Sequence, residues 1–253
     1  MSLKDKTIVV TGGSRGLGLG LVEALVDQGA KVTVVARDQA ALAAAKRRLG
    51  VAVIPADVTD HGAARRILAD VRPGVLVLNA GATPRMGRLD QLSWADFTAP
   101  WETDVKAGLY WMQAALTLPL APGARVLVGS SGAALQGSPL SGGYAGAKRM
   151  LWIMAKYANG VAEQKRLGIR FQAIVPQQMI GGTGVGDAGA GAYAQAMGVS
   201  REAFLARFGT PLPPRQFGDH LVALLDDPRY ATGLAFGLKG DTGITVLEEG
   251  EAA

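Results

Sequence analysis

The chain has 253 residues, of which 49% are hydrophobic and 19% charged, a composition typical of a globular protein with one sizeable core. The absence of cysteine excludes disulfides, thiolate metal sites and a cysteine nucleophile, and the two histidines leave little for a zinc site or a serine–histidine hydrolase. The net charge of +5 comes from scattered basic residues without interleaved aromatic ones, so we expect no nucleic-acid partner.

No apolar run reaches the roughly 18 residues that a membrane span needs. The N-terminal sequence MSLKDKTIVVTGG leads directly into a predicted strand and has no signal-peptide layout. We therefore expect a cytoplasmic protein that does not act at a membrane. His61 and His220 each follow an aspartate on a predicted helix, which indicates helix-surface or capping roles and no metal site.

Short β-branched runs alternate with helix-forming runs along the chain. The expected strands are 7–10, 31–36, 51–57, 75–81, 125–131 and 169–175. The expected helices are 16–28, 38–49, 60–71, about 100–120 and about 142–167. Because most of these strands are continuous apolar runs, we expect them to be buried on both faces of a parallel sheet with helices on each side.

Residues 181–198 hold seven glycines, and such a segment suits a flexible loop that closes over a ligand, although a disordered insertion is the alternative. We expect residues 177–215 as a whole to form a substrate-binding lid. Its apolar members either line a pocket or belong to the core; they are Met179, Ile180, Tyr193, Met197 and Phe204. Arg201, Arg207 and Arg215 either meet an acidic group of the substrate or remain solvated at the surface.

The sequence TGGSRGLG (11–18) directly follows the first strand and opens the first helix. Gly12, Gly16 and Gly18 allow a tight turn and the close approach of a pyrophosphate to the helix N-terminus. In this strand–loop–helix context the pattern predicts a dinucleotide site, in which we include Ser14 and Leu17; a purely structural turn is the alternative.

Two arginines favour one dinucleotide over the other. Arg37 stands at the end of the second strand, where an acidic residue would bind the ribose hydroxyl of NAD(H), and Arg15 lies inside the glycine loop. Two guanidinium groups suit a 2′-phosphate, so we predict NADP(H) as the cofactor and NAD(H) as the alternative. Asp38 would favour NAD(H) as a ribose ligand, but we interpret it as a helix cap.

The motifs, taken in order, resemble those of the short-chain dehydrogenase/reductase family over about residues 1–176. The matches are TGGSRGLG, Asp57–Val58 after the third strand, Asn79-Ala80-Gly81 after the fourth, a serine after the fifth, and Tyr144…Lys148. The resemblance implies one doubly wound, Rossmann-type domain over residues 1–253, a three-layer α/β/α sandwich. It also implies an oxidoreductase of subunits that assemble as dimers or tetramers.

The resemblance assigns roles to single residues. Asp57 would bond the adenine amino group, Val58 would line its pocket, and Asn79, Ala80 and Gly81 would shape the floor beside the cofactor, with Pro176 near the nicotinamide. Ser131, the second of the Ser130–Ser131 pair, would hold the substrate oxygen, Tyr144 would transfer the proton, and Lys148 would also hold the nicotinamide ribose.

Lys148 lies one helical turn beyond Tyr144, so both side chains project from one face of the helix. A cation about 4 Å from a phenolate stabilises it by roughly 4 kcal/mol at an effective dielectric constant near 20, and burial opposes this effect. We therefore expect Tyr144 to exchange a proton near neutral pH. Taken singly, a tyrosine that packs and a lysine on the surface would be the ordinary interpretations.

Two residues depart from the family pattern. Asp104 stands where the family usually has an asparagine, and its backbone carbonyl would still hold a water of the proton relay. Gln177 follows Pro176 where the family usually has a glycine.

The sequence thus predicts an NADP(H)-dependent oxidoreductase that interconverts a carbonyl and a secondary alcohol, with a small ketone as substrate. The family resemblance alone adds a 3-oxoacyl thioester as a candidate. The alternative is a catalytically weak NADP(H)-binding regulatory or scaffold protein. A surplus of apolar residues on two long helices predicts a homodimer or homotetramer, or a cover by the C-terminal segment. These residues are Val105, Leu109, Tyr110, Trp111, Met112, Leu116, Met150, Leu151, Trp152, Met154 and Tyr157.

Overall fold

Eight strands form one sheet in the order β3-β2-β1-β4-β5-β6-β7-β8 at the centre of a computed structural model that describes residues 2–118 and 120–247. The strands are β1 (Thr7–Thr11), β2 (Lys31–Ala36), β3 (Ala52–Pro55), β4 (Val75–Leu78), β5 (Arg125–Gly129), β6 (Arg170–Pro176), β7 (Ala235–Lys239) and β8 (Gly243–Val246). The helices are α1 (Gly16–Asp27), α2 (Gln39–Leu49), α3 (His61–Val71), α4 (Trp94–Pro100), α5 (Lys106–Thr117), α6 (Ala133–Gln136), α7 (Tyr144–Gln164), α8 (Gly184–Met197), α9 (Arg201–Ala206) and α10 (Pro214–Asp226).

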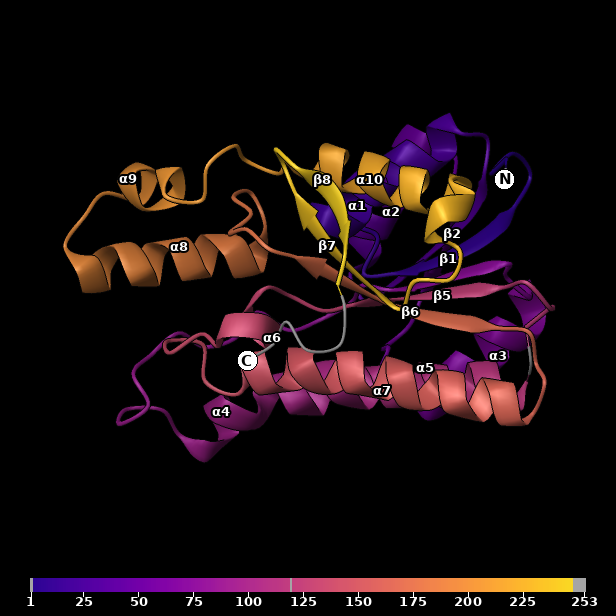
Figure 1. The fold of residues 1–253 in the computed structure, drawn as a ribbon, viewed down its shortest axis with the longest axis horizontal. Helices are drawn as coiled ribbons and strands as arrows, with labels where there is room; N and C mark the ends of the chain where they lie inside the picture. The colour runs from indigo at the N-terminus through magenta and orange to yellow at the C-terminus, as the bar shows by residue number, and fades with distance from the viewer. Residues whose placement is uncertain (1, 119, 248–253) are drawn as a thin grey trace.

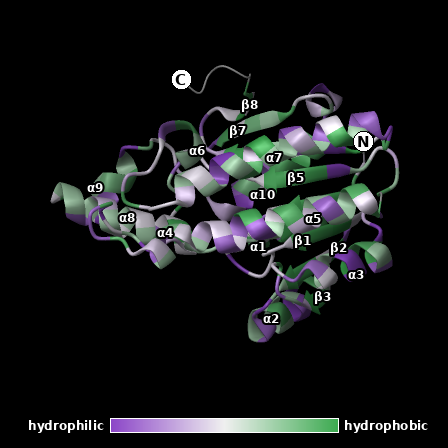
Figure 2. Cartoon of the chain, turned by 90° about the horizontal axis from the view of Figure 1, so that it is seen from below, coloured by the Kyte–Doolittle hydropathy of each residue, from purple (hydrophilic) through white to green (hydrophobic). Residues whose placement is uncertain are grey.

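Helices cover both faces of the sheet, so the chain forms one α/β domain of three layers (Figure 1). Helices α3, α5 and α7 cover one face, and α1, α2 and α10 cover the other. Alternate residues of a strand serve the two cores, as Val9 faces the first and Ile8 and Val10 face the second. The strands are accordingly mostly hydrophobic, whereas the helices carry hydrophobic and hydrophilic residues on different sides (Figure 2).

The sheet is parallel from β3 to β7, as predicted, but β8 runs antiparallel to β7. A short turn joins the two strands, and a turn of this length permits only the antiparallel arrangement. No helix in the described parts of the chain combines the length and the apolar character that a membrane crossing demands.

The long helical stretch predicted over about residues 100–120 is present and begins earlier, at Trp94, but a π-helical turn over Trp101–Val105 lies between α4 and α5. Pro100 lacks a backbone N–H, and its ring crowds the carbonyl group four residues earlier, so the regular hydrogen-bond ladder cannot continue through it. A π-helical turn widens the helix by one residue and rotates the side chains that follow, and such turns are frequent at functional sites.

The flexible loop predicted over residues 181–198 is wrong, because most of this segment forms helix α8. The Thr183 hydroxyl accepts a hydrogen bond from the Gly186 N–H group at 3.1 Å and caps the helix start. Ala190 and Ala194 then pack with Phe204 of α9 in a small separate core. The helix cap and this packing offset the cost of about 1 kcal/mol that each interior glycine imposes. Together α8 and α9 form a lobe beyond the edge of the sheet (Figure 1).

Helix α7 is fastened to the sheet by one buried amide. Asn159 donates from its Nδ2 to the carbonyl group of Phe171 at 2.7 Å, and its Oδ1 accepts from the Phe171 N–H group at 2.9 Å. The side chain thus satisfies both backbone groups of a β6 residue that lies before the pairing of β6 with β7 begins at Ala173.

We expect Asn159→Ala to lower the free energy of unfolding by about 2 kcal/mol, because it leaves a buried donor and a buried acceptor of Phe171 without partners. Urea denaturation of both proteins measures this difference. Gln164→Ala, at the exposed end of the same helix, is the matched control and should change the free energy by less than about 0.5 kcal/mol. Equal midpoints for the Asn159→Ala protein and the wild type would contradict the proposed fastening.

Candidate active site

The site lies where the strand order reverses, between β1 and β4, at the carboxyl ends of the parallel strands. In doubly wound sheets this position opens a crevice, because the connections on either side run to opposite faces. A cavity of about 510 Å³ occupies it, and most of the predicted cofactor residues line this cavity. They are Gly12, Ser14, Arg15, Gly16, Leu17, Arg37, Asp57, Val58, Asn79, Ala80, Gly81, Tyr144, Lys148 and Pro176.

Gly18, also predicted for the cofactor site, does not line the cavity and instead allows two loops to meet. A Cβ atom on Gly18 would lie 2.2 Å from the carbonyl oxygen of Gly12. Gly12 itself has a φ of +67°, and a Cβ atom there would lie 2.7 Å from the Cα atom of Ala80. Only glycine fits at either position, so the two glycines set the shape of the turn beneath the cavity.

Thr11, which the sequence did not single out, joins the ends of β1 and β4. Its hydroxyl donates to the carbonyl group of Val77 at 3.2 Å and accepts from the N–H groups of Asn79 and Ala80 at 3.1 and 3.2 Å. The Asn79 amide in turn donates to the carbonyl group of Gly12 at 3.3 Å. These bonds hold the two loops that form the floor of the cavity.

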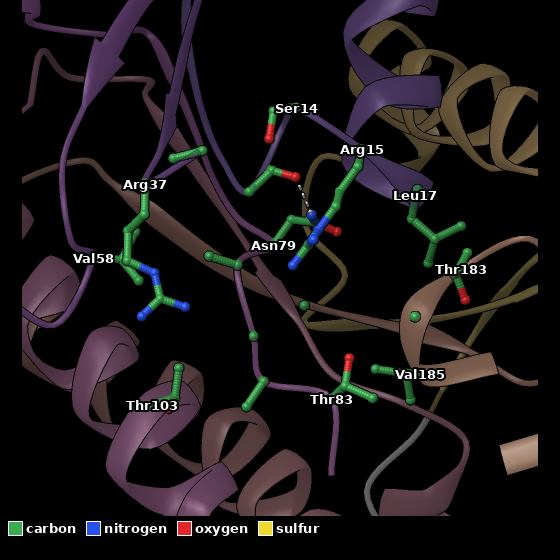
Figure 3. A pocket seen from close by; sticks show the side chains of 18 of the residues that line it. Ser14, Arg15, Leu17, Arg37, Val58, Asn79, Thr83, Thr103, Thr183 and Val185 are labelled. Carbon is green, nitrogen blue, oxygen red and sulfur yellow. Dashed lines mark hydrogen bonds between the residues drawn. The ribbon is translucent and has the colours of Figure 1, made fainter. Parts of the chain in front are cut away.

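Arg15 and Arg37 both line the cavity, and they come from two different loops (Figure 3). Arg37 Nη1 lies 3.7 Å from Asp57 Oδ2. The pKa of the Asp57 carboxyl is lowered, first by a hydrogen bond from the Thr59 N–H group, then by the Thr59 hydroxyl and the charge of Arg37. Asp38 caps α2 by accepting from the Ala41 N–H group at 3.0 Å, which confirms its interpretation as a helix cap.

A second cavity, of about 720 Å³, adjoins the first, and its walls are largely apolar. Tyr144 lines both cavities and stands at their junction. Ser131 lines the second cavity, whereas the hydroxyl of its neighbour Ser130 is bound to the backbone carbonyl group of Lys148 at 2.8 Å. Of the two adjacent serines, Ser131 is therefore the one whose hydroxyl is available to a ligand.

Lys148 forms a buried ion pair with Asp104. Its Nζ lies 2.9 Å from Asp104 Oδ2, and the side chains are 8% and 0% exposed. The same Nζ donates to the carbonyl group of Gly129 at 3.4 Å and lies 5.6 Å from the centre of the Tyr144 ring. Burial lowers the pKa of Lys148, but the charges of Asp104 and Tyr144 and the hydrogen bond to Asp104 outweigh it, and the net pKa is raised above 10.5.

Asp104 lies in the π-helical turn and lines neither cavity. Its Oδ1 accepts a hydrogen bond from the Ala82 N–H group at 2.7 Å, which links it to the loop after β4. An asparagine here could serve Ala82 with its oxygen only by turning its NH₂ group toward the ammonium group of Lys148. A carboxylate accepts from both donors, so the aspartate at this position fits the neighbours that the fold provides.

Several residues around the cofactor cavity were missed from the sequence: Thr83, Thr103, Thr183, Gly184, Val185 and Phe217. Thr183 and Val185 reach the cavity from the start of α8 (Figure 3). The available signal was a threonine before an alanine-rich run, which predicts a capped helix. Gln177 lines the second cavity, and its backbone N–H group donates to the carbonyl group of Leu238 at 3.0 Å.

The two histidines stand apart from both cavities. His61 begins α3 and packs edge-on against Tyr110 at 5.1 Å between ring centres, and His220 Nε2 lies 3.1 Å from the carbonyl oxygen of Lys239. Within residues 2–118 and 120–247, no three His, Cys, Asp or Glu side chains gather closely enough to hold a metal ion.

Fold and cavity together define a nucleotide-binding α/β protein, and comparison with known proteins gives its family. A family model described as short chain dehydrogenase matches residues 6–185. L-fucose dehydrogenase from Rattus norvegicus is 30% identical over 244 residues, which are 93% of this chain and 88% of that protein. The chain belongs to the short-chain dehydrogenase/reductase family, whose members are oxidoreductases that bind nicotinamide cofactors.

Two further similarities are narrower. A rhamnolipid-biosynthesis 3-oxoacyl-[acyl-carrier-protein] reductase from Pseudomonas aeruginosa is 37% identical over 91 residues, 32% of this chain and 36% of that protein. A solved structure of a short chain dehydrogenase/reductase family protein superimposes with a TM-score of 0.72 at 22% identity, covering 94% of this chain and 97% of the other. The latter supports the fold alone.

The buried ion pair yields a stability prediction. We expect Asp104→Asn to lower the free energy of unfolding by about 3 kcal/mol at neutral pH, because the Lys148 ammonium group then loses its buried counter-ion. Without Asp104, burial should lower the folded-state pKa of Lys148 below its unfolded value. The loss of stability relative to the wild type should therefore shrink as the pH rises from the folded-state pKa to the unfolded-state pKa. Urea denaturation of the cofactor-free proteins between neutral and alkaline pH measures both effects.

Lys148→Met completes a double-mutant cycle with Asp104→Asn. Because the double variant leaves no unpaired buried charge, it should be more stable than Asp104→Asn alone. Additive effects of the two substitutions would show that the ion pair does not stabilise the fold.

Proposed function

We propose that the protein is an NADP(H)-dependent oxidoreductase that interconverts a carbonyl group and a secondary alcohol, with Tyr144 as the general acid and base. The observation that carries this proposal is the position of Tyr144 at the junction of the two cavities, beside the buried ammonium group of Lys148. One cavity has the glycine turn of a dinucleotide site, and the other has the walls of a substrate pocket.

The residues of the site then take separate roles. The Ser131 hydroxyl would donate a hydrogen bond to the substrate oxygen, and the Tyr144 hydroxyl would give that oxygen a proton in reduction and take it back in oxidation. Lys148, held by its ion pair with Asp104, would place its ammonium group beside the Tyr144 ring. The nicotinamide cofactor, when bound, supplies or accepts the hydride.

The preference for NADP(H) rests on Arg15 and Arg37, which both line the cofactor cavity. A 2′-phosphate carries charge that two guanidinium groups can bind with charge-assisted hydrogen bonds. Asp38, which would oppose this preference, is engaged as the cap of α2. Gly12, Gly16 and the start of α1 would receive the pyrophosphate.

For the substrate, we propose a ketone or a 3-oxoacyl thioester. The names of the relatives point to two chemistries, a sugar for one and a 3-oxoacyl group for the other. The second cavity has apolar walls that include Met86, Leu135 and Met179. Such walls suit the alkyl chain of an acyl group.

We also propose assembly into dimers or tetramers through α5 and α7. Leu109 of α5 and Tyr157 of α7 are 42% and 62% exposed. The other apolar residues of these helices contribute less than expected to this surface, because Trp111, Met112 and Leu151 are buried in the core of the domain itself.

Replacement of Tyr144 by phenylalanine tests the catalytic role. We expect kcat/KM for NADPH-dependent reduction of a reactive ketone to fall by at least about a hundredfold, because the proton donor is lost. The Kd for NADPH, measured by fluorescence titration, should stay within about threefold, because the ring remains. Reduction is followed by the absorbance of NADPH with ketones, aldehydes, quinones and 3-oxoacyl thioesters.

Equal turnover by the wild type and the Tyr144→Phe variant would show that the proton comes from another group. Tight NADPH binding by a wild type that reduces none of these carbonyls would favour the regulatory or scaffold alternative. Tyr157→Phe, on the exposed side of the same helix, is the matched control and should leave turnover unchanged.

A second test concerns the cofactor. We expect the Arg15→Ala/Arg37→Ala variant to raise the Kd for NADPH by about a hundredfold, because two charge-assisted hydrogen bonds to the phosphate are lost. The Kd for NADH should change by less than about threefold, since NADH lacks that phosphate. Arg47→Ala, at the exposed end of α2 away from both cavities, controls for net charge. Equal losses of affinity for NADPH and NADH would refute the proposed preference for NADP(H).

A further inference from the structure

The walls of the second cavity carry charge of one sign only. Among its described lining residues, Arg207 and Lys239 are charged, and none is a carboxylate. Arg207 follows α9 and is exposed, whereas Lys239 ends β7 and is half-buried. A cavity with two cations and no anion attracts negatively charged ligands.

The side chain of Gln178 brings these two cations to one part of the cavity. Its Nε2 donates to the carbonyl groups of Phe208 and Thr210, both at 2.7 Å, and its Oε1 accepts from the Gly240 N–H group at 2.6 Å. Phe208 directly follows Arg207, and Gly240 directly follows Lys239. One half-buried amide group thus fixes the backbone beside each cation, and the two charges come from segments held against each other.

Neither cation is neutralised within the parts of the chain that the structure describes. Arg207 Nη1 lies 3.2 Å from the sulfur of Met197, and no ion pair forms at Arg207 or Lys239. The other arginines considered as substrate contacts are engaged elsewhere, because Arg201 pairs with Asp187 and Arg215 pairs with Asp27 and Asp219. Asp241, the acidic residue that follows Gly240, accepts a hydrogen bond from the Thr242 N–H group.

Lys239 is separated from the reacting groups by the width of two strands. Ser131 follows β5, and Lys239 ends β7, with β6 between them. Neighbouring strands lie about 4.8 Å apart, so the two strand ends are roughly 10 Å from each other. Lys239 faces the cavity because Phe236 and Leu238, the alternate residues of β7, belong to the opposite core.

Several other lining residues of this cavity are apolar. They include Met86, Leu135, Met179, Ile180 and Phe208, and methionine side chains adapt to ligands of different shape. A ligand that fills this cavity therefore meets hydroxyl groups, apolar side chains and two cations.

We propose that the substrate is an elongated amphiphilic carbonyl compound with an apolar body and an anionic group, and that Arg207 and Lys239 form the subsite for the anion. This inference rests on the proposed carbonyl–alcohol activity and adds the charge class of its substrate. The anion is a carboxylate at the end of an alkyl chain or a phosphate on the thiol-derived arm of a thioester. Both offer oxygens that accept charge-assisted hydrogen bonds from a guanidinium and an ammonium group.

The test compares matched substrates that differ only in charge. The first pair is a medium-chain methyl ketone with a terminal carboxylate and its methyl ester. The second pair is one 3-oxoacyl group on coenzyme A, whose arm carries phosphates, and on N-acetylcysteamine, whose arm is neutral. The enzymes are the wild type, Arg207→Gln, Lys239→Gln, their double variant and Arg47→Gln, which removes the same charge from a distant surface.

We expect the wild type to prefer the charged member of at least one pair by about tenfold in kcat/KM. This factor is the combined effect expected when two partly exposed cations each attract the anion. This preference should fall to about one in the double variant, persist in Arg47→Gln and weaken as salt is added. The kcat/KM for the neutral member should change little. The pair that shows the preference identifies the carboxylate or the phosphate as the anion.

Turnover of charged and neutral members at equal rates by the wild type would overturn the inference while leaving the proposed activity intact. The inference would also be overturned if the double variant retained the wild-type preference for the charged substrate.

Calorimetric titration of decanoate and its methyl ester into the cofactor-free proteins separates the subsite from the reaction. We expect decanoate to bind the wild type more tightly than its ester, and the double variant to bind both equally. That result in a protein that reduces no carbonyl would support the anion subsite and reject the proposed activity. Equal affinity of the wild type for the two probes would overturn the subsite.

Discussion

The buried ion pair between Asp104 and Lys148 joins three segments that lie far apart in the sequence. Its carboxylate also binds the Ala82 N–H group, so the loop after β4, the π-helical turn and α7 share one set of charge-assisted contacts. Such a pair tolerates little movement, because each partner alone would be an uncompensated charge in the interior. The ion pair therefore also limits the movement of Tyr144, which lies one helical turn before Lys148 at the junction of the two cavities.

Most of the fold and of the cofactor cavity was predictable from the sequence, because each signal is local. Continuous apolar runs identified six of the strands, and the glycine turn at Gly12 and Gly16 identified the end of the sheet at which the cavity opens. Arg37 and Asp38 were interpretable because a strand end and a helix start are fixed by the residues beside them. Ser131 could be separated from Ser130 only through the motif spacing, and the hydrogen bond of Ser130 to Lys148 gives the physical reason.

The features that could not be predicted depend on contacts between distant segments. Pro100 signals an irregular helix, but the resulting π-helical turn directs Asp104 toward Lys148, a partner 44 positions along the chain. The glycines of residues 181–198 indicate flexibility, and only the packing of Ala190, Ala194 and Phe204 shows why the segment is helical. Likewise, Arg207 and Lys239 become neighbours of one cavity only through the three hydrogen bonds of Gln178.

The separate small core of α8 and α9 has a consequence for how such a protein can diversify. Because this lobe is stabilised by its own apolar contacts, mutations in it can accumulate without disturbing the two cores that enclose the sheet. Substitutions in the lobe can therefore change the second cavity, except at the lobe's first residues, Thr183 and Val185, which also line the cofactor cavity. Gln178 should tolerate substitution less well, because its side chain joins the segment after α9 to the segment after β7.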